Sequence, residues 1–77
     1  MNMHLIPWRP DADIFGEAAG LVYCDRILDL VATPTNERCA WDVVDGCDIL
    51  ASGIAGSMAE AKRAAETAAR REVLHIA

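Results

Sequence analysis

Residues 41–73 read WDVVDGCDILASGIAGSMAEAKRAAETAARREV, and this stretch decides the fold. Two apolar runs, 39–44 and 47–53, flank the dipeptide Asp45-Gly46. A tight hairpin turn of type I′ needs positive φ at both central residues, and Asp-Gly adopts that conformation at little cost. The stretch therefore predicts a β-hairpin with Asp45 and Gly46 as its loop.

The pairing of this hairpin determines which side chains share a face. A two-residue loop places Val44 opposite Cys47 and Trp41 opposite Leu50. Both faces are then largely apolar, with Trp41, Val43 and Leu50 on one and Val44, Cys47, Ile49 and Ala51 on the other. A single covering layer leaves one apolar face exposed, so either the N-terminal segment or a partner covers it. We favour the N-terminal segment, since large apolar patches are rare on monomers.

A helix follows the hairpin. Ser57-Met58-Ala59-Glu60 matches a capping box, in which the serine oxygen accepts from a first-turn amide. The helical period places one apolar stripe opposite a charged face. The stripe consists of Met58, Ala61, Ala64, Ala65 and Ala68, with Ala69 at its edge. Small residues predict a close approach between this helix and the sheet.

The N-terminal part is less patterned. Pro7 and Pro10 bracket Trp8, which predicts an extended arm over residues 1–10, ahead of one domain over 11–77. Asp11 or Asp13 can cap a short helix through Ile14, Phe15, Ala18 and Ala19. Residues 21–24 either continue this helix or form a short strand, and residues 26–33 read as a strand. The expected fold is α+β: a three-stranded antiparallel sheet packed by a C-terminal helix, in the order α-β-β-β-α.

The size and charge of the chain favour a binding protein over an enzyme. The chain has 77 residues and a formal net charge of −5. Residues 10–56 hold nine acidic side chains against Arg26 and Arg38, a balance of −7. Such a surface repels phosphate and attracts basic partners. A chain this short has only a few kcal/mol of stability with which to support a strained active site.

No pattern of catalytic or metal-binding residues stands out. The three cysteines form no Cys-x-x-Cys pair, and His4 and His75 lie near opposite ends of the chain. The sequence therefore predicts no enzymatic activity, no cofactor and no metal. It has no apolar run long enough for a membrane span and no signal-peptide pattern, which predicts a cytoplasmic protein that does not bind a membrane.

Residues 38–72 resemble the second half of a double-stranded-RNA-binding domain. The similarity rests on Val44-Asp45-Gly46, Leu50, Gly53, Gly56-Ser57, Glu60-Ala61-Lys62 and Ala64-Ala65. The family has the α-β-β-β-α fold and grips phosphates with two lysines after the serine that begins its last helix. Met58 and Ala59 occupy those two positions here, so the resemblance implies the fold and argues against RNA binding.

The compact, acidic, alanine-rich layout is also similar to that of small phage and prophage proteins, anti-CRISPR inhibitors among them. That likeness implies a non-enzymatic inhibitor, acting in the host cytoplasm, whose acidic face occupies a basic, nucleic-acid-handling site on a larger protein or ribonucleoprotein complex. We expect the acidic face to comprise Asp25, Asp29, Asp42, Asp45 and Asp48.

Two alternatives stay open from the residues alone. A degenerate RNA-binding domain would use the cations of the helix, Lys62, Arg63, Arg70 and Arg71. A homodimeric interaction module would use hydrophobic candidates at the second hairpin face and elsewhere, namely Trp8, Val44, Ile49, Val73 and Ile76. Trp8 is either a lid on that face or an exposed anchor.

Overall fold

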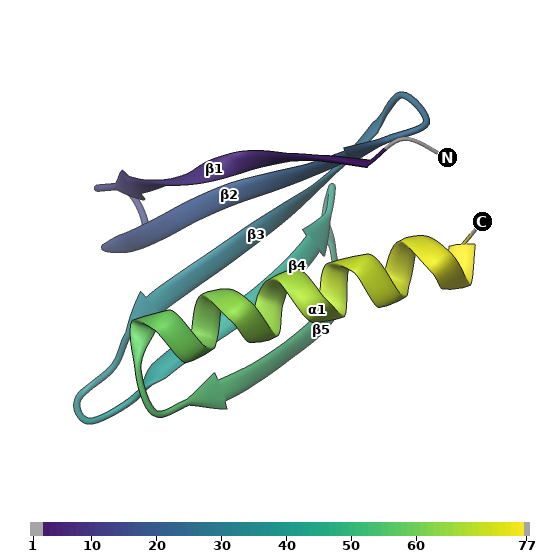
Figure 1. The fold of residues 1–77 in the computed structure, drawn as a ribbon. Coiled ribbons are helices and arrows are strands. Elements are labelled where there is room, and N and C mark those ends of the chain that lie inside the picture. The colour runs from purple at the N-terminus through teal and green to yellow at the C-terminus, as the bar shows by residue number, and fades with distance from the viewer. Residues whose placement is uncertain (1–2, 77) are drawn as a thin grey trace.

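Five antiparallel strands followed by one helix make up the protein (Figure 1). The computed structural model describes residues 3–76, and of Ile76 only the backbone. The strands pair in sequence order as a meander. The elements are β1 (Met3–Asp11), β2 (Gly16–Tyr23), β3 (Arg26–Pro34), β4 (Cys39–Asp45), β5 (Asp48–Ala55) and α1 (Met58–Ile76). The expected α-β-β-β-α order with three strands is therefore wrong.

The helix packs on one face of the sheet, and the fold has two layers. In Figure 1, α1 lies in front of β3, β4 and β5, whereas β1 and β2 extend the sheet beyond it. The residues expected to cover the second hairpin face have instead become two further strands beside β3. Within residues 3–76, no element lies over the opposite face of the sheet.

The core lies between α1 and the central strands. Leu28, Leu30 and Val43 of the sheet are fully buried against Ala65 and Val73 of the helix, as part of one cluster. Alanines on the buried side bring the helix axis close to the sheet, so a thin layer of side chains suffices to exclude water. The positions of the core residues determine which sheet face is left for other contacts.

The N-terminal helix predicted after Asp11 is absent, and a turn followed by β2 takes its place. The backbone N–H of Asp13 donates to the Asp11 carboxylate at 3.0 Å, a local bond that favours a turn. Phe15 has a φ of 54°, which ends any helical run. A Cβ on Gly16 would lie 2.2 Å from the carbonyl oxygen of Ala32, so glycine allows β2 to lie close to β3.

A second hairpin joins β2 to β3 and was not predicted. Its two loop residues, Cys24 and Asp25, have φ angles of 45° and 63°. Positive φ at both central positions is the type I′ geometry, here formed without glycine. The absence of glycine explains why the turn was missed, although apolar residues flank it on both sides.

The β4–β5 hairpin exists, but its predicted register is wrong. Asp45 pairs with Asp48, so Gly46 and Cys47 form the loop, and Gly46 alone has a positive φ. The pairing shifts between Val43 and Val44, where a bulge inserts one extra residue into β5. The bulge places both Leu50 and Ala51 against the core, although they are neighbours in the strand.

The predicted helix start is confirmed. Ser57 Oγ accepts from the backbone N–H of Glu60 at 3.2 Å. The buried stripe is shifted from the predicted one, because Ala69 is fully buried whereas Ala64 and Ala68 are half-buried. With the helix in this orientation, Glu66 lies on the side that faces Trp8 of β1.

Candidate binding face of the sheet

The sheet face opposite α1 is the largest feature that the fold leaves uncovered. Side chains alternate along each strand, so the neighbours of the buried residues point away from the helix. We call this set the open face. It comprises His4, Ile6, Arg9, Ala18, Gly20, Val22, Ile27, Asp29, Val31, Thr33, Ala40, Asp42, Val44, Ile49, Ser52 and Ile54.

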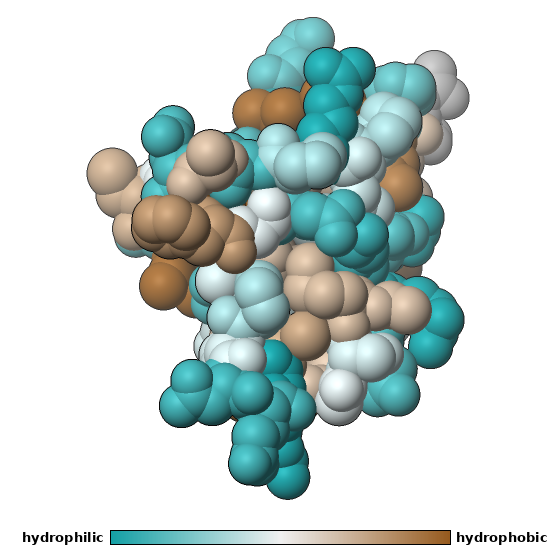
Figure 2. Space-filling model, turned by 90° about the vertical axis from the view of Figure 1, so that its left-hand side faces the viewer, coloured by the Kyte–Doolittle hydropathy of each residue, from teal (hydrophilic) through white to brown (hydrophobic). Residues whose placement is uncertain are grey.

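Several large apolar side chains of the open face are exposed. Ile27 is 45% exposed, Ile49 65% and Ile54 60%. Figure 2 views the molecule from the end with the β1–β2 turn, and brown hydrophobic surface gathers on the left of this view. By register, each of the five strands places at least one apolar side chain on the open face, and exposed apolar patches usually mark interaction sites.

Two carboxylates lie in the middle of this apolar surface. Asp29 is paired in register with Val44, and Asp42 with Val31, so the two acids lie on neighbouring strands. Asp29 is exposed and Asp42 is half-buried. Neither forms an ion pair with any other residue in the described part of the chain. Both carboxylates are free to pair with a cation on a partner.

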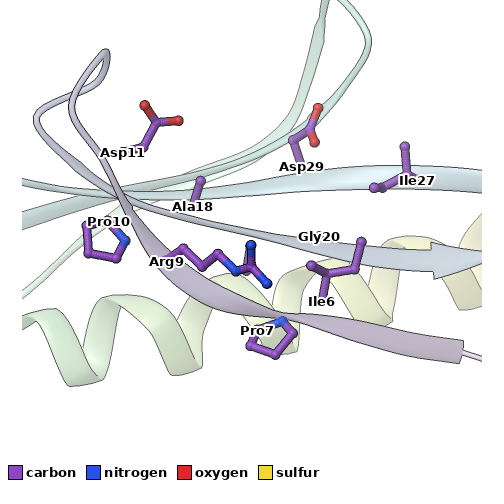
Figure 3. Close-up of a pocket in the computed structure, with 10 residues that line it drawn as sticks. Ile6, Pro7, Arg9, Pro10, Asp11, Ala18, Gly20, Ile27 and Asp29 are labelled. Atoms are coloured by element: carbon purple, nitrogen blue, oxygen red, sulfur yellow. The ribbon is translucent and has the colours of Figure 1, made fainter.

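A hollow of about 410 Å³ indents the open face over β1, β2 and β3 (Figure 3). Ala18 and Gly20 of β2 form its floor. A Cβ on Gly20 would lie 3.0 Å from Ile27 Cδ1 and 3.3 Å from Ile6 Cδ1, so both side chains lie close to the glycine and a larger residue there would displace them. Arg9, Asp11 and Asp29 supply charged groups along the walls.

The predicted acidic residues fall into two groups. Asp29 and Asp42 lie on the open face, whereas Asp25, Asp45 and Asp48 lie in or beside the turns at one end of the sheet. Arg26 forms an ion pair with Asp45, which ties the β2–β3 turn to the β4–β5 turn. The structure thus does not gather the five acids into one continuous face.

The cations of α1 are dispersed as well. Lys62 Nζ lies 2.7 Å from Glu17 Oε1 and 5.9 Å from the centre of the Trp8 ring. Arg70 lies 3.7 Å from Glu66. The two remaining arginines, Arg63 and Arg71, line a shallow hollow beside Trp41. Since two of the four cations are already paired with carboxylates of the protein, the helix presents no unopposed cluster for phosphates.

The hydrophobic candidates lie in different parts of the structure. Val44 and Ile49 belong to the open face. Trp8 packs on the helix side, where its Nε1 donates to Glu66 Oε2 at 2.9 Å, so it is neither a lid on the second face nor a free anchor. Val73 is fully buried and belongs to the core. The side chain of Ile76 lies outside the described residues.

Except for Asp29, the open-face residues of β1–β3, including Ile6, Gly20 and Ile27, were missed by sequence reasoning. Alternation in GEAAGLVY, residues 16–23, was the available signal, but small residues at four of its eight positions weaken the apolar contrast. No group of three or more potential metal ligands occurs among the described residues. Within residues 3–76, no helix combines the length and the apolar content needed to cross a bilayer.

Comparison with known protein families, with curated protein sequences and with solved structures finds no match for this chain.

Proposed function

We propose that this protein is a small, non-enzymatic binding protein whose open face docks on a basic and partly apolar surface of a larger protein or ribonucleoprotein complex. The concrete version is an inhibitor of the anti-CRISPR type, produced by a phage and acting in the host cytoplasm. One observation carries the proposal: an uncovered sheet face with exposed isoleucines surrounds two carboxylates that have no cationic partner among the described residues.

The size of the open face supports a specific interface. Five strands spaced about 4.8 Å apart, each rising about 3.3 Å per residue over roughly eight residues, span about 600 Å² in projection. Projecting side chains raise the accessible area above this value. A standard protein interface buries about 800 Å² on each partner, so the open face is close to the required size.

Charge favours a basic partner over a second copy. Each chain carries a net charge of −5, and its open face has Asp29 and Asp42 near the centre. Packing this face on its own copy brings four carboxylates together with only two Arg9 side chains to neutralise them. A partner that presents lysine or arginine avoids the cost of burying these carboxylates unpaired.

The test compares two charge reversals of equal size. The open-face variant carries Asp29→Lys and Asp42→Lys, and the control carries Asp25→Lys and Asp48→Lys at the turns. Bacteria with an active CRISPR system are challenged with a targeted phage while expressing each protein, across a panel of CRISPR types. We expect the unaltered protein and the control to restore plaques, and the open-face variant to restore at least tenfold fewer.

Equal plaque counts with both variants would refute the role of the open face. Failure of the unaltered protein on every system would refute the inhibitor version. Asp29→Asn with Asp42→Asn provides a milder pair of changes, and thermal denaturation verifies that each variant folds. Affinity capture with the same variants then tests docking itself, since a true partner is retained by the control and lost by the open-face variant.

A further inference from the structure

The hollow of the open face differs from the rest of that face in both shape and charge. Its floor is made of Ala18 and Gly20 of β2, neither of which carries more than a methyl group. Ile6 and Ile27 wall it from the two neighbouring strands. Its volume of about 410 Å³ is within the roughly 300–1,000 Å³ range of ligand clefts.

The charges around the hollow are not balanced. Asp29 projects from β3, and Asp11 lies at the end of β1 (Figure 3). Arg9 is the one cation of the lining, and it forms no ion pair within residues 3–75. Two carboxylates against one guanidinium leave the hollow with an excess of negative charge beside its aliphatic walls.

We propose that this hollow is the anchor site for a partner segment that carries an aliphatic side chain directly next to an arginine or a lysine. This inference rests on the proposed docking of the open face and names the chemistry of the contact. The aliphatic group packs on Ile6 and Ile27, and the cation pairs with Asp29. Arg9 donates hydrogen bonds to a backbone carbonyl of the segment, because its guanidinium retains free donors.

Such an arrangement explains how a shallow surface achieves selectivity. An apolar side chain alone gains little from an open hollow, and an exposed ion pair alone contributes little. Placed side by side, the aliphatic group excludes water from the ion pair and strengthens it. Anchors of this kind, surrounded by weaker contacts, carry most of the binding energy in protein interfaces.

The test uses three short peptides and nuclear magnetic resonance titration of the ¹⁵N-labelled protein. The probe is N-acetyl-Leu-Arg-amide, and the controls are N-acetyl-Ser-Arg-amide and N-acetyl-Leu-Gln-amide. We expect the probe to shift the amide signals of Ala18, Gly20 and Asp29 and to bind at least fivefold more tightly than either control. Equal binding of the three peptides, or no shift at these residues, would overturn the inference.

Two matched variants locate the contact. Ala18→Leu fills the hollow from its floor, whereas Ala59→Leu adds the same group at an exposed position of α1, away from the open face. We expect at least fivefold weaker binding of the probe to Ala18→Leu and unchanged binding to Ala59→Leu. Equal binding to both would also overturn the inference. Ala18→Leu keeps Asp29 and Asp42, so the hollow can fail while whole-face docking, tested by the charge reversals, still holds.

Discussion

Two substitutions on opposite faces of the sheet distinguish a covered face from an open one. Leu28 is fully buried beneath α1, so Leu28→Ala leaves a cavity and is expected to lower the free energy of unfolding by about 2–5 kcal/mol. Ile49 is 65% exposed on the open face. Full burial of such a side chain contributes about 1.5–3 kcal/mol. Since Ile49 is only about one third buried, Ile49→Thr is expected to lower the free energy of unfolding by roughly 1 kcal/mol or less.

Threonine is chosen for the open face because it is β-branched and keeps the strand preference of isoleucine. The measurement is urea denaturation followed by tryptophan fluorescence, at two protein concentrations tenfold or more apart. We expect Leu28→Ala to cost at least about twice as much as Ile49→Thr, with no dependence on concentration.

A loss above about 2 kcal/mol for Ile49→Thr at both concentrations would refute the reasoning, because it would mean that part of the chain covers the open face. A loss that grows with concentration would instead show that a second copy covers it, which contradicts the argument from charge for a basic partner.

Three further predictions concern the scaffold. Gly53→Ala places a Cβ 2.7 Å from Cζ2 of Trp41, so the ring must move. We expect the free energy of unfolding, measured by thermal denaturation, to fall by about 1–3 kcal/mol and the tryptophan fluorescence to change. Unchanged stability would contradict this contact. Tyr23 is buried, and its hydroxyl has no hydrogen-bond partner among the described residues. In urea denaturation, Tyr23→Phe is therefore expected to leave the stability unchanged or to raise it by about 1 kcal/mol. A clear loss of stability would reveal a partner for the hydroxyl. Ser57→Ala removes the acceptor for the Glu60 amide and is expected to cost about 1 kcal/mol in the same measurement, while Ser57→Asp, which also caps, restores most of it; equal stability of the two variants would argue against the cap.

Local signals in the sequence predicted the elements that depend on neighbouring residues. Ser57 and Glu60 lie three positions apart, and their contact forms within one helical turn. Asp45-Gly46 correctly located a turn. Its register was missed because Leu50 and Ala51 both pack on the core, and this tertiary preference moved the loop by one residue.

The candidate site was only partly predicted. Val44, Ile49, Asp29 and Asp42 were named from the sequence, and all four lie on the open face. Their grouping was not foreseen, since Asp25, Asp45 and Asp48 were expected beside them. The part of the face contributed by β1 and β2 was missed because residues 1–10 were interpreted as an extended arm outside the domain and the residues after Asp11 as a helix.

The sequence by itself determined the hairpin, the capped helix, the acidic charge and the presence of apolar side chains on both hairpin faces. These properties arise from contacts within a few residues or from composition alone. Only the tertiary structure decided what became of the second face. Residues 3–23 gained backbone hydrogen bonds by extending the sheet as β1 and β2, so they did not fold back across it, and the face stayed open. The pairing of strands distant in the sequence then placed Asp29 and Asp42 among the isoleucines.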